Sequence, residues 1–423
     1  MRMVDRTVLH LQIARTLRSV SQGIAIVDMA LYLKDLHWSA AAIGGVFSTA
    51  GIVGALLILL VGVMSDKLGR KPFLLVYESL TVIAALLLTM TTNPVALTVI
   101  IVLTGFGRGQ NGAAGPFTPA EQAWMASRVP RQVRGRVFST NTALGFFGMA
   151  AGSIIGGSTH LWSKSLPGAQ SFHPLFWFMF AFSVACLVTI ASAPSDKRQL
   201  KSDMTDPVPT PETSESTSEQ SSERSIRRQE NKNMAKLAGV NMLNGLAVGF
   251  VGPMMSYWFA TRFGVSSAQI GVTLALSFVF TGASSLVAGF LSQRFGMVKS
   301  VVWLQLSGVV MILVLPLMPS FTLASAIYIV RSAFSRGTQG VRSALSSSLT
   351  RDKRRGFSVS MNSLAMRTSS AVGPTLSGYM LDLGVFSVPF FLTGGLQLVS
   401  TLLYGRLFRS FDAPSDREQT HQA

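Results

Sequence analysis

Ionisable side chains are rare in the long apolar stretches of this sequence, so the few that occur there are the first candidates for chemistry. Asp28 is the sharpest, because it lies within the apolar residues 11–33. A charged group at membrane depth is unfavourable unless it is paired or faces water. A carboxylate in a partly dehydrated site can, however, bind and release a proton in the cellular pH range. We predict that Asp28 carries a proton; alternatively it pairs with a neighbour near the outer membrane surface or contacts a bound molecule.

The residues around Asp28 share one face of the helix that this stretch predicts. At 100° per residue, a stripe about 120° wide holds a set of mostly polar side chains. These are Arg18, Ser21, Gln22, Ala25, Asp28 and Tyr32. We expect this face to line a water-filled cavity, which makes Arg18, Gln22 and Tyr32 candidates for contact with a molecule held there.

Length and composition indicate which elements must position these residues. The chain has 423 residues, of which 48% are hydrophobic and only 13% are charged, so a soluble protein is a poor explanation. A helix needs about 20 apolar residues to cross a bilayer, and the sequence contains twelve such stretches. They are residues 11–33, 41–63, 72–92, 95–118, 136–158, 174–194, 236–260, 267–291, 299–318, 321–346, 357–381 and 386–407. The sequence therefore predicts an all-α membrane protein with twelve transmembrane helices.

The strongly positive charge follows from this topology. The net charge is +17, from 36 Lys and Arg against 19 Asp and Glu. With a cytoplasmic N-terminus, only Lys34, Lys164 and Arg262 fall in external loops, which is the positive-inside pattern. We therefore expect no nucleic-acid partner. An even number of helices places both termini in the cytoplasm.

The chain divides into two halves of six predicted helices. Residues 195–235 are rich in Ser, Thr, Glu and Pro and predict a flexible cytoplasmic linker. It separates a bundle of residues 1–194 from a bundle of residues 236–407, and residues 408–423 form a cytoplasmic tail.

The two halves repeat one another in sequence. Ser39 matches Ser266 and Gly69 matches Gly296, in both cases 227 positions further on. Two related six-helix halves are typical of transporters whose bundles rock about a central site.

Three motifs carry a resemblance to a known family. The segment GVMSDKLGRK at residues 62–71 resembles motif A of the major facilitator superfamily, and Arg108 with Gly112 is similar to its motif B. The segment GMAAGSIIGG is similar to motif C of the antiporter branch, with Ser153 where proline is usual. The resemblance covers nearly the whole chain. It implies two pseudo-symmetric six-helix bundles, alternating access to a central site, and a monomer.

In that family the motif A turn holds the bundles together on the cytoplasmic side in the outward-open state. The resemblance thus implies a latch made of Gly62, Asp66, Gly69, Arg70 and Lys71, with Glu121 as a further member. Gly62 would allow close approach of two helices and Gly69 a tight turn. The alternative is that Lys67, Arg70 and Lys71 only fix the orientation of the chain.

Arginines of the two halves are candidates for substrate contact. Arg108 and Arg336 occupy equivalent positions. By resemblance, Arg108 lies at the cavity or supports proton transfer; it could instead pair with Glu121 or cap backbone carbonyls. Arg331 has no equivalent in the first half, where Leu103 stands. If Arg331 faces the cavity, an anionic group on the substrate is favoured.

The remaining polar candidates have structural alternatives. We expect Glu78 and Glu121 to pair with basic residues of the loops, Glu121 through Arg70; the other interpretation is a proton relay. Asn241 and Asn244 can hydrogen-bond a substrate or only the neighbouring helices.

Small residues predict close helix packing at Gly148, Gly152 and Gly156, and at Gly373 with Pro374. We expect a surface along which the bundles move, although static packing would need the same residues.

No metal-ligand spacing, phosphate-binding loop or nucleophile with a nearby base occurs, and the single Cys186 allows no internal disulfide. We therefore expect no cofactor, no metal and no enzymatic activity, and an ion gradient as the energy source. The favoured function is export of small organic molecules by proton antiport across the cytoplasmic membrane. The alternatives are uptake of a metabolite, including an anion, by symport or uniport, and a sensor or partner subunit that transports nothing.

Overall fold

The regular elements of the computed structural model are all helices within the residues it describes, which are 5–108, 115, 118–130, 134–194, 217–348 and 355–409. The first half contains α1 (Arg6–Asp35), α2 (Ala40–Leu68), α3 (Arg70–Met90), α4 (Pro94–Thr104), α5 (Thr118–Arg128), α6 (Arg134–Gly156) and α7 (His173–Ser192). The second half contains α8 (Thr217–Val251), α9 (Met255–Phe263), α10 (Ser267–Phe295), α11 (Met297–Val314), α12 (Phe321–Gly337), α13 (Gln339–Ser348), α14 (Arg355–Ser370), α15 (Gly373–Asp382) and α16 (Val388–Phe408). The predicted all-α class is confirmed.

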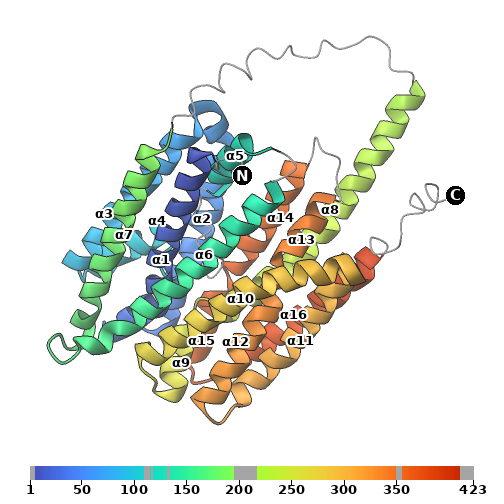
Figure 1. The fold of residues 1–423 in the computed structure, drawn as a ribbon. Helices are drawn as coiled ribbons and strands as arrows, with labels where there is room; N and C mark the ends of the chain where they lie inside the picture. Colours follow the sequence, from blue (N-terminus) through green and yellow to red (C-terminus); the bar gives the residue numbers. More distant parts are fainter. Residues whose placement is uncertain are drawn as a thin grey trace.

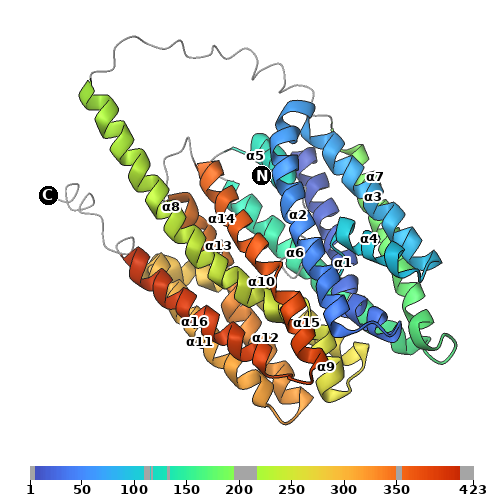
Figure 2. The same ribbon diagram turned by 180° about the vertical axis from the view of Figure 1, so that it is seen from behind.

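The helices form two bundles that lie side by side. Figure 1 shows α1 to α7 in one bundle and α8 to α16 in the other, with α6 and α10 meeting between them. Seen from behind in Figure 2, α2 runs beside α14 and α15. We call the end with the α2–α3 turn the Gly69 end, and the end with the α1–α2 turn the Asp382 end.

The sequence repeat is visible in matching helices. α2 and α10 each contain 29 residues, and each follows a serine, Ser39 or Ser266, whose side chain caps its first turn. Each helix ends at a glycine with nearly the same backbone angles: φ 90° and ψ 148° at Gly69, φ 94° and ψ 152° at Gly296. A positive φ is readily adopted only by glycine, so both turns depend on this residue type.

Four of the twelve predicted helices are interrupted. The stretch 95–118 breaks after α4, where Gly105 and Gly107 have φ values of 68° and 78°. The stretch 236–260 breaks between α8 and α9 at Gly252 and Pro253, and proline supplies no backbone N–H to a helix. The stretches 321–346 and 357–381 divide into α12 with α13 and α14 with α15. Single continuous helices were predicted at these four places, and that detail is wrong.

Seven helical segments of the described residues are long and apolar enough to cross a membrane. They are Ala40–Ile58, Arg70–Met90, Gly168–Ser192, Ser225–Phe263, Ser267–Phe295, Met297–Leu317 and Val388–Phe408. Most of the other predicted spans lie on interrupted helices or, like α1, carry buried charges.

The linker prediction needs a correction. α8 begins at Thr217, inside the segment 195–235 that was expected to be flexible, and continues without a break to Val251. Figure 1 shows its first part extending beyond the other helices at the Gly69 end. Glu, Gln, Arg and Lys are good helix formers, so a polar composition does not exclude helix here. Residues 195–216 and the tail beyond 409 lie outside the described part of the chain.

Several hydrogen bonds between the bundles lie toward the Asp382 end. The carboxylate of Asp382 accepts from the backbone N–H groups of Ala40 and Ala41, each at 2.8 Å. The hydroxyl of Thr375 donates to that of Ser48 at 2.7 Å. These partners lie in the first three turns of α2, so the bundles are hydrogen-bonded together at this end.

Candidate functional site

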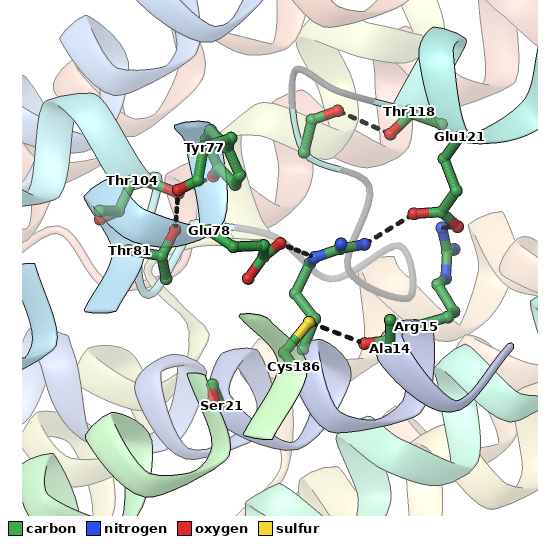
Figure 3. Close-up of polar contacts among 12 residues, drawn as sticks. Ala14, Arg15, Ser21, Tyr77, Glu78, Thr81, Thr104, Thr118, Glu121 and Cys186 are labelled. Atoms are coloured by element: carbon green, nitrogen blue, oxygen red, sulfur yellow. Dashed lines mark hydrogen bonds and ion pairs between the residues drawn. The ribbon is translucent and has the colours of Figure 1, made fainter. Parts of the chain in front are cut away.

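Arg18 is the centre of a buried ion-pair network in the first bundle. Its Nε donates to Oε1 of Glu78 on α3 at 2.6 Å, and its Nη1 donates to Oε2 of Glu121 on α5 at 2.7 Å. Arg15 lies with its Nη1 3.8 Å from Oε1 of Glu121. Figure 3 shows Glu78, Glu121 and Arg15 gathered in this network. It ties α1 to α3 and α5.

This network corrects two sequence predictions. Glu78 and Glu121 were expected to pair with basic residues of the loops, and Glu121 with Arg70. Their ion-pair partners are instead arginines of α1, because α5 packs against that helix and the Glu78 side chain of α3 reaches Arg18. Arg18 was expected to contact a substrate, but its guanidinium is held between two acids inside the first bundle.

The predicted polar stripe of α1 points into its own bundle. The hydroxyl of Ser21 donates to the carbonyl of Met179 on α7 at 3.4 Å. The ring of Tyr32 packs edge-on against Phe172 and Phe176, with centroids 5.7 and 4.9 Å away. These contacts place Tyr32 among the aromatic side chains near the start of α7.

The other side of α1 faces the second bundle and is also buried. The carbonyl of Ile26 accepts from the hydroxyl of Ser256 on α9 at 2.7 Å, and every residue from Gly23 to Leu33 is buried. The expectation of one water-lined face is therefore wrong for this part of α1. Gln22 is partly buried, and its Oε1 has no hydrogen-bond partner among the described residues.

Asp28 is completely buried between α1 and α6. Neither carboxylate oxygen has a hydrogen-bond partner in the described part of the chain. Its Oδ2 lies so close to Gly156 that a methyl group on that glycine would come within 2.7 Å. A buried polar group without a partner is costly, and a buried unpaired charge far more so. Asp28 is therefore the clearest departure, in the first bundle, from the rule that buried polar groups are hydrogen-bonded.

The contact between the first bundle and α10 continues past the end of α6, one residue beyond Gly156. A side chain on Gly157 would meet the backbone of Ala268 on α10 at 3.0 Å, and one on Gly271 would meet the backbone of Gly157. The hydroxyls of Thr159 and Ser267 are hydrogen-bonded across the same contact. Asp28 thus lies directly behind a close contact of the two bundles at the Asp382 end.

The described contacts of the motif A turn stay within the first bundle. Arg70 donates from Nη1 to the carbonyl of Ala123 on α5 at 3.2 Å. Lys71 donates from Nζ to the carbonyls of Ala191 and Ala193, at 2.8 and 2.6 Å, at the end of α7. A cation at the C-terminus of a helix is favoured by the helix dipole. The surroundings of Gly62 and the side chain of Asp66 lie outside the described part of the structure. The predicted latch therefore stays a prediction.

Arg108 lies in a turn after α4 rather than within a helix, because two left-handed glycines precede it. Its Nη2 donates to the hydroxyl of Ser370 on α14 at 3.3 Å, which is a bond between the two bundles. Gly51 of α2 leaves room for the guanidinium, since any side chain there would overlap it. Arg108 therefore bridges the bundles and makes no ion pair with Glu121.

Asn241 is bonded to neighbouring helices, as the structural alternative predicted. Its Oδ1 accepts from Arg342 on α13, and its Nδ2 donates to Asn362 on α14 at 3.3 Å. Asn244 is buried on the same helix. Contact of Asn241 or Asn244 with a substrate stays a prediction.

Arg331 has a partner that the sequence analysis did not single out. Its Nη2 lies 3.5 Å from Oε1 of Gln397 on α16, and both side chains are buried. A glutamine inside the last apolar stretch is the signal that could have drawn attention to it. Arg336 donates to the hydroxyl of Tyr328 at 3.1 Å and lies over the ring of Phe278.

The predicted small residues pack mainly within each bundle. A side chain on Gly148, Gly152 or Gly156 would strike α1 of the same bundle, and one on Gly373 would strike α8. The carbonyl of Pro374, in contrast, lies against Gly44 of α2 across the bundle interface. The three α6 glycines therefore face α1 of their own bundle and not the second bundle, so the surface between the bundles was predicted at the wrong residues.

Metal chemistry has no support among the described residues, where no group of three or more His, Cys, Asp or Glu could hold an ion. Cys186 is buried and has no disulfide partner.

Comparison with known proteins places these features in a family. The family model described as Major Facilitator Superfamily matches residues 12–229 and 237–422. The chain belongs to the major facilitator superfamily. This confirms the resemblance seen in the three motifs and the fold of two six-helix halves, and it identifies the chain as a multi-pass membrane transporter.

Individual members of the superfamily are only distantly similar. An uncharacterized membrane protein of Saccharomyces cerevisiae (YJR124C) is 20% identical over 420 residues, which are 94% of this chain and 93% of that one. The multidrug resistance protein MdtG of Erwinia billingiae is 26% identical over 155 residues, or 36% of each chain. The structure of a D-xylose–proton symporter superposes with a TM-score of 0.72 at 14% identity, over 95% of this chain and 97% of that one. This last likeness shows the fold alone.

Proposed function

We propose that this superfamily member is a proton-coupled secondary transporter in which Asp28 binds the coupling proton. The observation that carries the proposal is the complete burial of Asp28 without a hydrogen-bonding partner in the described part of the chain. Because an unpaired charge is far more costly to bury than a neutral acid, the closed arrangement of α1 and α6 favours the protonated side chain. Proton release then favours an arrangement that admits water.

The position of Asp28 supports a link between protonation and access to the central site. Its carboxylate touches Gly156 at the end of α6, and the next residue of the chain, Gly157, packs against α10 of the other bundle. A change in α1–α6 packing would therefore be transmitted to the contact that holds the Asp382 end together. We place the Gly69 end in the cytoplasm of a cell membrane on the positive-inside rule, so the closed end faces outward.

The direction we propose is export of small organic molecules by proton antiport. Support comes from the similarity of about a third of the chain to proteins named for multidrug resistance, and from the motif C-like segment of α6. A second candidate is uptake of an organic anion by proton symport, which the buried arginines of the second bundle favour.

The test uses the full chain in proteoliposomes with an imposed pH gradient. The probes are ethidium as a drug-like cation and radiolabelled citrate as an organic anion. If the protein is an antiporter, the probe crosses the membrane in the direction opposite to the protons. If the probe instead accumulates inside the vesicles together with inward proton flow, the protein is a symporter and the proposal of export by antiport is wrong.

The coupling role of Asp28 is tested in the same vesicles. We expect Asp28→Asn to lose gradient-driven accumulation at least tenfold while keeping exchange of the probe across the membrane. Asp35→Asn, an exposed acid at the end of the same helix, is the matched control and should behave as wild type. Full gradient-driven flux in Asp28→Asn would contradict the assignment.

A further inference from the structure

The two bundles differ in how their buried charges are balanced. In the first bundle the buried arginines of α1 face the carboxylates of Glu78 and Glu121. In the second, residues 236–407 contain two acids, Asp352 and Asp382, and Asp382 is bonded to the start of α2 at the outer edge of the fold. A further acid of this bundle, Glu230, is buried nearer the start of α8. The helices of this bundle nevertheless carry buried or half-buried arginines, among them Arg331, Arg336, Arg342 and Arg367.

Two of these arginines contact neutral groups. Arg342 donates to the amide of Asn241 and lies over the ring of Tyr404. Arg336 donates to the hydroxyl of Tyr328. These partners satisfy hydrogen bonds and supply cation–π attraction, but they do not neutralise the charge.

Arg331 and Gln397 form a buried site with an excess of donors. They are 6% and 4% exposed, and a single contact of 3.5 Å joins Nη2 of the arginine to Oε1 of the glutamine. Nε of Arg331 and Nε2 of Gln397 have no acceptor among the described residues. Arg336 follows Arg331 by five residues on α12. Two buried donors without an acceptor, one of them on a guanidinium, fit an acceptor that carries negative charge.

We propose that the substrate of this transporter carries an acidic group, a carboxylate or a phosphate, which binds at Arg331 and Gln397 with Arg336 adding a second positive charge. The planar guanidinium can donate two parallel hydrogen bonds to either group. The proposal rests on the proposed transport function and holds for either direction of transport.

The first experiment measures thermal unfolding of the purified full chain in detergent, with the variant Arg331→Gln. Chloride is exchanged for sulfate or citrate at constant ionic strength. We expect the divalent or trivalent anion to raise the unfolding temperature of wild type by about 2–4 °C more than that of Arg331→Gln, because binding to the folded state stabilises it. Arg406→Gln, which removes an exposed arginine of α16, should respond as wild type. Equal responses of wild type and Arg331→Gln would overturn the proposal.

The second experiment needs no ligand. In dilute chloride, Arg331→Gln should unfold at the same temperature as wild type or higher, because the substitution removes an unneutralised buried charge. Arg18→Gln should unfold at a lower temperature, because it takes the described cation from the buried Glu78 and leaves Glu121 with only the longer contact to Arg15. If Arg331→Gln is destabilised as strongly as Arg18→Gln, Arg331 is structural and the proposal fails.

The two proposals fail in different ways. Loss of the anion response only in Arg331→Gln, together with full gradient-driven flux in Asp28→Asn, would keep the anion site and remove the proton assignment. An Asp28-dependent flux with no anion response at Arg331 would keep proton coupling and remove the anionic substrate.

Discussion

At the scale of single residues, buried charges in this protein fall into matched and unmatched groups. Arg18 is matched, because it donates to two carboxylates from two other helices. Asp28 and Arg331 have no partner of opposite charge among the described residues. A buried charge with a partner of opposite charge is explained by the packing of the helices. A buried charge without such a partner indicates that a proton, an ion or a substrate binds there and balances it.

Removing the cation of the matched network should therefore weaken the fold. We expect Arg18→Gln to lower the free energy of unfolding by about 3–5 kcal/mol, the usual cost of leaving a buried charge without its partner. The measurement is the unfolding midpoint of the purified protein in detergent. Arg6→Gln removes an exposed arginine of the same helix and should have no effect. A stable Arg18→Gln protein would mean that solvation by water compensates Glu78 and Glu121 for the lost cation.

At the scale of elements, the repeated halves use the same helix ends, but the contacts between halves depend on individual glycines. Gly44 and Gly45 are neighbours on α2, yet only Gly44 lies against the backbone of α15, at Pro374. Gly45 has open space around it. This difference makes the pair an internal test of how α2 closes on α15.

A methyl group at Gly44 should hinder closure of the Asp382 end. We expect Gly44→Ala to reduce the rate of substrate exchange in proteoliposomes at least fivefold, because backbone atoms of α15 would have to move away. Gly45→Ala should exchange at the wild-type rate. If both variants exchange equally fast, this end does not close as tightly during transport as it does in this structure.

At the scale of the whole molecule, Asp382 joins the two bundles at one end. Its carboxylate accepts two backbone N–H groups at the N-terminus of α2, where the helix dipole also favours negative charge. Ser39 caps the same turn from within the first bundle. The pairing therefore stabilises the arrangement in which the Asp382 end is closed.

Neutralising this acid should shift the population of closed and open arrangements. We expect Asp382→Asn to lengthen the distance between spin labels at positions 35 and 383, which are exposed near this end, in a larger fraction of molecules. An asparagine can accept only through one oxygen, so it cannot replace both bonds at full strength. An unchanged distance distribution would show that the carboxylate contributes little to closure.

The sequence by itself determined the class of the protein and its plan. Long apolar stretches, the asymmetry of Lys and Arg, and the match of Ser39 and Gly69 with Ser266 and Gly296 are local features of the chain. They predict the membrane spans, the orientation of the chain and its internal repeat, and none of these predictions requires knowing how the helices pack. The motif A turn and its relatives were enough to indicate the superfamily.

Only the tertiary structure decided which polar side chains meet. Glu78 and Glu121 lie 60 and 103 residues from Arg18 in the chain, so no local pattern could assign them to it. The polar stripe on α1 could not distinguish a face that lines a water-filled cavity from a face that packs inside its own bundle. In either case the polar residues would lie on one face of the helix. The contact between Arg331 and Gln397 likewise depends on how the side chains of α12 and α16 meet in the folded bundle, and hydrophobic patterning carries no information about that contact.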